Sequence, residues 1–386
     1  MSSILFCHDG PLSIDSKDNI YGVAHTNEMF SRYNIIADDV NILIRFKNVD
    51  NAKGLNQIDK EKFKIKQSPN MTNIESWIHF KKNIRVFKEN IEKADYIVIR
   101  VPGIQGIICY HIAKKYKKKI LLELVGDPYL AYKYHSIKGW LIAPLMRRIY
   151  KNMLKNSEWT LYVTNHYLQH EYPSIGARLA CSNVEIDHKD IVLNKHKYAH
   201  FDLKQNVIKL GTISPLNIKF KNQEAVIKSL GLLKKKGIEN FEYYLVGPGD
   251  NTRLKKIAIK ENVHDKIHFI GVLKRKDIYK YLDSLDIYIQ PSKQEGLPRA
   301  IIEAMSRGVV CLGATTAGIP ELLEPKYLFS NKKTNYKEIV EILLNLKKEN
   351  LMQTSELNYY KSFEYEKEKL HKKRNEFFLE FKETLI

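Results

Sequence analysis

Short apolar runs alternate with stretches of helical periodicity through the second half of the chain, and this alternation restricts the fold more than any other feature. Each run has four or five residues and is followed by turn-forming or polar residues, as expected of buried strands. Such alternation is typical of an α/β fold with a doubly wound parallel sheet. The expected strands are Val207–Gly211, Glu242–Val246, Ile267–Ile270, Ile287–Gln290 and Val309–Gly313, and the expected helices are Gln223–Lys236, Asn251–Glu261, Lys276–Leu285 and Arg299–Arg307.

The first half of the chain shows the same alternation less regularly. It opens with an expected strand at Ile4–His8, a polar loop over residues 9–21 and a helix over residues 23–33. Further strands are expected at Tyr96–Arg100, Ile120–Leu124 and Leu161–Thr164, and helices at Gly106–Tyr116 and in a long run ending near Asn156. We therefore predict a second doubly wound α/β domain.

A chain of 386 residues is longer than one ordinary domain of about 100–200 residues. The polar segment Asp187–Gln205 has no sustained periodicity and predicts an interdomain linker, so we expect domains at residues 1–190 and 205–355. Residues 356–386 are highly charged but carry hydrophobic residues near helical spacing, which predicts a helix that packs along a domain. These hydrophobic residues are Phe363, Leu370, Phe377, Phe378 and Phe381.

Lys and Arg outnumber Asp and Glu by 63 to 44, which gives a formal net charge of +19. The excess is spread along the chain, so it fits either a compositional bias toward Lys or an attraction to phosphates and lipid headgroups. No secretory signal is evident, and no apolar run approaches the ~20 residues of a membrane span, so we expect a cytoplasmic protein. Its cysteines, Cys7, Cys109, Cys181 and Cys311, are far apart and are expected to be reduced.

The segment from Pro291 to Gly308 is the richest in functional signals, because it predicts a strand end, a turn and a helix. Pro298 suits the first helical position and Gly308 the left-handed position beyond the helix end. Such a turn lies at the carboxyl edge of a parallel sheet, where a helix N-terminus favours an anion. Glu295 and Glu303 would lie about 12 Å apart on a helix, too far for a glycosidase pair. Their spacing instead predicts contacts with two ends of one elongated, hydroxyl-bearing ligand.

The run from Glu295 to Leu322 resembles the donor-binding signature of family-four glycosyltransferases, retaining enzymes of GT-B fold. Segments around Gly211, Gly247, Gly271 and Pro291 resemble the same family in the same order. The resemblance implies two Rossmann-like domains facing across a cleft, with the C-terminal helix crossing back to the first domain. It also implies the donor contacts. Glu303 is expected to hold the donor ribose and Glu295 to face the transferred sugar. The diphosphate is expected to be bound by Gly296, Leu297 and Lys221, the base to be packed by Val272 and Leu273, and the donor also to be contacted by Thr212 and Gly247.

In the first domain the resemblance implies an acceptor-binding role. Gly22 and His25 occupy the place of the family's glycine loop, although a histidine at a helix start also fits a structural role. Asp127 lies where many members carry a catalytic histidine, and it also fits an ordinary helix N-cap. At Thr212 this chain departs from the arginine that is usual in the family.

No nicotinamide, P-loop or metal-site motif is present, so we predict metal-independent chemistry without a cofactor. The predicted reaction is retaining transfer of a hexose from a UDP- or GDP-linked donor to a saccharide, expected to be lipid-linked, in biosynthesis of a surface polysaccharide such as capsule or lipopolysaccharide. The basic and apolar stretch Lys138–Lys151 indicates peripheral contact with an anionic membrane or, equally, core packing. A nucleotide-sugar epimerase of GT-B fold and a basic nucleic-acid-binding α/β protein remain as alternatives; the transferase prediction itself includes no nucleic-acid partner.

Overall fold

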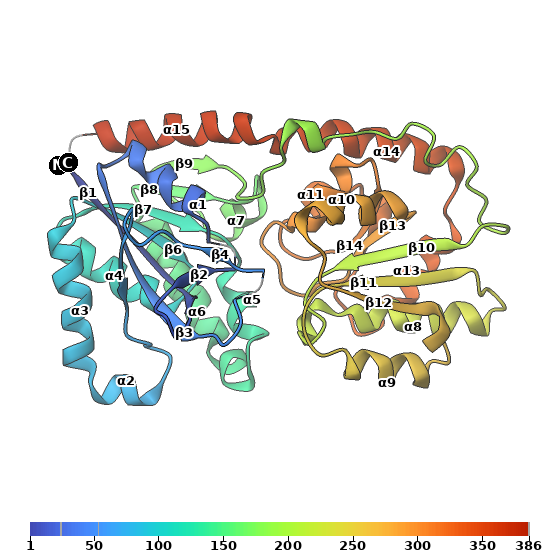
Figure 1. Ribbon diagram of the computed structural model, residues 1–386, viewed down its shortest axis with the longest axis horizontal. Coiled ribbons are helices and arrows are strands. Elements are labelled where there is room, and N and C mark those ends of the chain that lie inside the picture. The colour runs from blue at the N-terminus through green and yellow to red at the C-terminus, as the bar shows by residue number, and fades with distance from the viewer. Residues whose placement is uncertain (24, 53, 385–386) are drawn as a thin grey trace. The chain divides into compact units, whose positions relative to one another are not determined.

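The computed structural model describes residues 1–23, 25–52 and 54–384 and divides into two compact units (Figure 1). Unit 1 comprises Met1–Cys181 together with His371–Ile386, and unit 2 comprises Ser182–Leu370. Each unit contains a mainly parallel sheet flanked by helices, which confirms the predicted α/β, Rossmann-like fold class. The division falls at 181/182 instead of near residue 190, and the chain returns to unit 1 at His371 instead of 356.

Unit 2 has a six-stranded sheet in the order β12-β11-β10-β13-β14-β15, with every pairing parallel. Parallel strands covered on both faces need nearly continuous apolar sequence, which explains why the short runs were recognisable. The first five strands lie within two residues of the predicted positions, and the last was not predicted. They are β10 (Ile208–Ile213), β11 (Phe241–Val246), β12 (Ile267–Gly271), β13 (Ile287–Gln290), β14 (Val310–Ala314) and β15 (Leu328–Phe329).

Helices cover both faces of the unit 2 sheet, with α8 and α9 on one side and α10 and α11 on the other (Figure 1). The four predicted helices are confirmed within one residue at each end. Gly308 has a φ of +65°, the predicted left-handed position beyond α11. The helices are α8 (Gln223–Lys235), α9 (Thr252–Lys260), α10 (Arg275–Ser284), α11 (Arg299–Ser306), α12 (Ile319–Leu322), α13 (Asn335–Leu344) and α14 (Lys348–Ser362).

The segment expected as a linker packs on unit 2. Tyr198 is buried, donates to the carbonyl of Asp286 at 2.7 Å and accepts from the amide of Val310 at 2.9 Å. The amide of Val192 donates to Ser306 O at 2.9 Å. A polar sequence without periodicity therefore holds one buried anchor, and local pattern does not reveal it.

Unit 1 has its parallel strands in the order β5-β3-β1-β6-β7-β8-β9. Strand β2 pairs antiparallel with the last two residues of β1, and β4 pairs antiparallel with β2. The expected polar loop over residues 9–21 was wrong, because β1 continues through it to Ile14 and Leu12 is buried. The strands are β1 (Ser3–Ile14), β2 (Ile20–Gly22), β3 (Asp39–Asn48), β4 (Asn56–Gln57), β5 (Lys64–Gln67), β6 (Tyr96–Val101), β7 (Lys119–Leu124), β8 (Trp159–Tyr162) and β9 (Ala177–Ala180).

The two helices expected at Gly106–Tyr116 and in the run ending near Asn156 are present in unit 1, together with several shorter ones. The helix expected over residues 23–33 is only α1 (Asn27–Ser31), continued by a 3-10 turn over Arg32–Ile35. The others are α2 (Ile74–Ile78), α3 (Phe80–Lys93), α4 (Ile104–Lys115), α5 (Pro128–Lys133), α6 (Ile137–Lys155) and α7 (Tyr167–Glu171).

The C-terminal helix α15 (Lys367–Glu383) begins in unit 2 and continues in unit 1. Its phenylalanines form the expected stripe, which in unit 1 packs on aromatic residues of the core. The ring of Phe377 lies 5.1 Å from that of Trp159, and the ring of Phe378 lies 5.7 Å from that of Tyr33. Aromatic pairs at this separation add to the stabilisation from buried apolar area.

Candidate functional site

The strand order of unit 2 has a topological switch point between β10 and β13, and a ligand site is expected at the carboxyl ends of these strands. Numbered along the chain, the order is 3-2-1-4-5-6, so the connections reverse direction between these two neighbouring strands. In open α/β sheets, ligands bind outside the carboxyl ends of the strands at this switch point. The loops that follow Ile213 and Gln290 carry Lys221 and Glu295.

Backbone contacts join these two loops. The amide of Lys293 donates to the carbonyl of Phe220 at 2.8 Å, and the Asn222 side chain donates to the carbonyl of Pro291 at 3.2 Å. Asn222 itself is in the left-handed region, at a φ of +56°, where asparagine is tolerated. As a result, Lys221 Nζ lies 2.6 Å from Glu295 Oε1, and both side chains are largely buried.

Sequence reasoning did not identify the residue that orients Glu295. Gln290, at the end of β13, donates from Nε2 to Glu295 Oε1 and to Ser292 Oγ, both at 2.9 Å. Its own oxygen accepts from the Tyr288 hydroxyl at 2.6 Å. The buried side chain of Gln290 is therefore held at both ends, and it fixes the carboxylate beside Lys221. Its position on a buried strand was the available signal, since a glutamine there requires polar partners.

The turn after Glu295 leads into α11. Among the hydrogen bonds of the described residues, none uses the amides of Gly296 and Leu297 as donors. Pro298 was expected to be the first helical residue. In the structure it is the N-cap, and α11 begins one residue later. These amides and the helix dipole together favour a negatively charged group at this end of the helix.

Glu303 lies in the second turn of α11. Burial raises the pKa of its carboxyl, while the charges of Arg299 and Arg275 oppose that shift. The nearer of these cations, Arg299, has its Nη1 3.9 Å from Glu303 Oε1. A carboxylate with so few protein partners is suited to accept hydrogen bonds from ligand hydroxyls.

The other expected donor residues fall into two groups. Val272 and Leu273 follow β12 at the same edge of the sheet, and Val272 is exposed. Gly247 follows β11, and a Cβ there would lie 2.1 Å from the carbonyl oxygen of Ser214, so this backbone approach requires glycine. Thr212, in contrast, is fully buried inside β10, where its hydroxyl donates to Ile289 O at 2.5 Å and accepts from Tyr243 at 2.7 Å. The structure does not bring the Thr212 side chain to the edge.

In unit 1, Asp127 has a structural environment. It caps α5 by accepting from the amide of Leu130 at 3.2 Å. The hydroxyls of Tyr167 and Tyr172 donate to its two oxygens at 2.5 and 2.7 Å. Burial, together with this carboxylate, raises the pKa of both phenols, so they remain protonated donors. Asp127 is therefore a helix N-cap that also accepts from two tyrosine hydroxyls.

His25 is buried in an aromatic cluster, where its ring stacks on Phe30 at 5.7 Å and lies 5.4 Å from the ring of His8. Burial, with smaller contributions from His8 and Arg100, lowers the pKa of His25 to about 2. Gly22 packs against the same segment, since a Cβ there would lie 2.3 Å from the carbonyl oxygen of His25. Both residues therefore have packing roles in unit 1.

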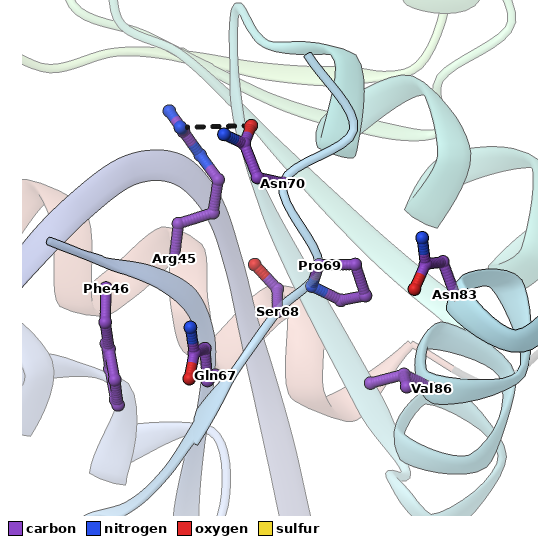
Figure 2. Close-up of a pocket in the computed structure, with 8 residues that line it drawn as sticks. All are labelled: Arg45, Phe46, Gln67, Ser68, Pro69, Asn70, Asn83 and Val86. Carbon is purple, nitrogen blue, oxygen red and sulfur yellow. Dashed lines mark hydrogen bonds between the residues drawn. The ribbon is translucent and has the colours of Figure 1, made fainter. Parts of the chain in front are cut away.

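Unit 1 also has a hollow of about 280 Å³ that sequence reasoning missed (Figure 2). It opens beside the carboxyl ends of β3 and β5, with Asn83 of α3 among its lining residues. Figure 2 shows Arg45 pointing toward Asn70, whose oxygen accepts from Arg45 Nη1 at 3.3 Å. Asp9 lies 3.0 Å from Arg45 Nε and neutralises its charge, so the hollow is polar and nearly uncharged. Strand β3 was not predicted, which is why these residues were not recognised.

Comparisons with known proteins agree with this architecture. The sequence model of the family described as "Glycosyl transferases group 1" matches residues 197–370. Protein CapJ of Staphylococcus aureus is 34% identical over 333 residues, which cover 85% of this chain and 83% of CapJ. The chain therefore belongs to the group 1 glycosyltransferases.

Solved structures show the same fold at low sequence identity. The HepE protein of Anabaena, in complex with UDP and glucose, aligns with a TM-score of 0.65 and 14% identity, covering 97% of this chain and 99% of HepE. WaaG, a glycosyltransferase involved in lipopolysaccharide biosynthesis, aligns with a TM-score of 0.61 and 14% identity, covering 97% and 98%. The fold is GT-B, as the sequence resemblance implied.

Proposed function

We propose that this glycosyltransferase moves a sugar, with retention of anomeric configuration, from a UDP- or GDP-linked donor to a hydroxyl of a saccharide. The observation that supports this most directly is the Lys221–Glu295 pair at the switch point of unit 2, beside two free amides and the desolvated Glu303. A cation, amide donors and two carboxylates match the diphosphate and hydroxyl groups of a nucleotide sugar.

Each group has a separate task in this proposal. The Lys221 ammonium has three protons, so it can keep its contact with Glu295 and still donate to the diphosphate. The amides of Gly296 and Leu297 complete the phosphate site, and Glu303 accepts from the ribose hydroxyls. Glu295 faces the transferred sugar. Family membership and the UDP and glucose bound by HepE support this assignment.

The reaction breaks the bond between the anomeric carbon and the phosphate oxygen and forms one to the acceptor oxygen on the same face of the sugar. The departing phosphate takes the acceptor's proton. Glu295 Oε1 accepts from Lys221 and Gln290, and the scheme assigns no covalent nucleophile. Lys221 and the amides stabilise the leaving group in this scheme, so activity should survive treatment with EDTA. A glycosyl adduct trapped on a carboxylate would contradict the scheme.

The acceptor in this proposal is a lipid-linked saccharide of a surface polysaccharide, bound by unit 1. The relationship to CapJ and the fold shared with WaaG support that class. The hollow lined by Gln67, Asn70 and Asn83 offers carboxamides that both donate to and accept from sugar hydroxyls. Replacing Gln67 and Asn83 by Ala should raise KM for the acceptor and leave KM for the donor unchanged.

The decisive experiment combines thermal shift with transfer of a labelled sugar. UDP- or GDP-sugars should raise Tm, and Glu303→Gln should abolish that shift. Glu239→Gln is the matched control. Glu239 lies just before β11, at the amino ends of the unit 2 strands, and this variant should keep the rise in Tm. Label must enter the saccharide only when acceptor is present, whereas an epimerase would convert the donor alone. Salt-dependent nucleic-acid binding without a nucleotide-sugar shift would favour the nucleic-acid alternative.

A further inference from the structure

Helix α6 of unit 1 has one face in the core and one apolar face that is uncovered within the unit. Gly139, Ala143, Met146, Tyr150, Met153 and Leu154 are buried. On the opposite side, large hydrophobic residues of the first turns are exposed: Ile137 by 83%, Trp140 by 57%, Leu141 by 65% and Leu145 by 58%. Ile137, Leu141 and Leu145 follow each other at four-residue spacing, so they form one stripe about 12 Å long.

The same outward face becomes basic in the later turns of α6. Arg148, Lys151 and Lys155 continue the line of Ile137 and Leu141 at three- and four-residue spacing, and all three are exposed. No acidic residue occurs between Asp127 and Glu158, while this stretch contains six Lys and Arg residues. The outward face is therefore apolar along its first half and basic along its second half, where Arg147, beside this line, is paired with Glu171 of α7.

This arrangement constrains what covers the face. An exposed apolar stripe of several large residues marks an interaction surface. A second copy of the chain in a two-fold contact would present the same surface, and cations would then meet cations. An anionic bilayer instead takes up apolar side chains below its headgroups and attracts cations at its phosphates. Trp140, beside Leu141 in the apolar half, is a residue type that prefers this interface.

We propose that α6 docks unit 1 on an anionic membrane surface, with Ile137, Trp140, Leu141 and Leu145 inserted among the headgroups and Arg148, Lys151 and Lys155 on the lipid phosphates. The enzyme lies on the bilayer in this arrangement. Within the described residues, no helix is both long enough and apolar enough to cross it. This proposal goes beyond the transfer reaction and is independent of which sugar is moved.

The test is sedimentation of the full chain with vesicles of equimolar phosphatidylcholine and phosphatidylglycerol, and with phosphatidylcholine alone. Wild type should bind the anionic vesicles at low salt and bind less as salt rises. Leu141→Ser with Leu145→Ser should weaken binding at least about tenfold, because two buried side chains are lost. Arg148→Gln with Lys151→Gln should weaken it about 25-fold, at about fivefold per cation.

A matched pair on unit 2, Ile259→Ser with Lys256→Gln, is the control and should bind like wild type. Ile259 is 64% exposed and lies on the basic helix α9. Nucleotide-induced thermal shifts should persist in every variant, so failure of membrane binding is distinguishable from failure of the donor site. Absence of wild-type binding, equal binding of the α6 variants, equal binding to neutral vesicles, or a lipid-free dimer that the α6 substitutions dissociate would each overturn the proposal.

Discussion

Six parallel strands of each unit follow the same order, 3-2-1-4-5-6, to which unit 1 adds further strands, but the side chains at the switch point differ between the units. In unit 1 the switch point lies between β1 and β6, and its side chains satisfy each other. Asp9 accepts from Arg45 and from the amide of Gln105, and Arg100 donates to Glu123. In unit 2, Lys221 and Glu295 retain some exposure next to two free amides.

The ion pairs at the two switch points show the difference most clearly. Arg100 lies 2.8 Å from Glu123, which is fully buried and also accepts from the Tyr33 hydroxyl at 2.8 Å. Burial opposes ionisation of Glu123, but Arg100 and Arg32 outweigh it and lower its pKa to about 2. The same switch point thus carries mutually paired, buried side chains in unit 1 and partly exposed ones in unit 2.

The largest effect on this comparison should come from Arg100→Met in unit 1. Removing one partner of a buried pair leaves an unpaired charge and should lower the free energy of unfolding by about 3–5 kcal/mol. Urea unfolding measures this loss. The double variant Arg100→Met, Glu123→Leu should recover much of it, since no buried charge remains. A loss below about 1 kcal/mol in the single variant would contradict the structural role.

The corresponding change in unit 2, Lys221→Met, should affect catalysis more than stability. Loss of a leaving-group donor should lower kcat by about 10²–10³. The loss of stability should be smaller than for Arg100→Met, because the side chains of Lys221 and Glu295 keep 18% and 11% exposure, against 9% and 0% for Arg100 and Glu123. Initial rates with a labelled donor measure the change in kcat, and urea unfolding measures the change in stability. Lys219→Met, an exposed neighbour, should retain wild-type activity. An equal loss of kcat in Lys219→Met and Lys221→Met would contradict a specific role of Lys221 in stabilising the leaving group.

Acidification should destabilise unit 1 before unit 2. Burial lowers the pKa of His8 to about 3 and that of His25 to about 2, from an ordinary value of 6.5. Below pH 6.5 the unfolded chain therefore binds protons that the folded chain does not, and stability falls as pH falls. From pH 7.5 to 5.5 each histidine should cost about 1.4 kcal/mol. Hydrogen exchange measures the stability of each unit separately. His25→Phe should remove half of the stability loss of unit 1 between pH 7.5 and 5.5.

The smallest effect should come from Asp127→Ala. Loss of the α5 cap typically costs about 0.5–2 kcal/mol, and the two tyrosine hydroxyls that lose their acceptor place this site at the upper end. Asp127→Asn retains a capping oxygen and should recover part of the loss. Transfer rates should stay within a few-fold of wild type in both variants. A hundredfold drop in kcat for Asp127→Asn would restore its assignment as a catalytic residue.

Sequence reasoning performed best where local pattern and final environment agree. The central strands β13 and β14 of unit 2 are buried on both faces, so their apolar runs stand out, and the segment around α11 has recognisable punctuation in Pro298 before the helix and Gly308 after it. It failed at β1, where a polar-looking segment continues as a strand because β2 and β3 pair with it. It also missed Tyr198, whose anchoring partners lie about 90 or more residues away in sequence.

The sequence by itself determined the alternation of strands and helices and the turn that carries Glu295 and leads to Glu303, because periodicity and turn chemistry act within a few residues. The two-domain GT-B class and the assignment of Lys221 came from the resemblance to a known family. Only the tertiary structure decided which polar side chains are used up inside the protein. Thr212 and Asp127 are indistinguishable from ligand-binding residues until their partners, Ile289 and Tyr172, come within hydrogen-bonding distance. Hydrogen bonding and desolvation depend on neighbours that are distant in sequence, and those neighbours are set by the packing of the whole unit.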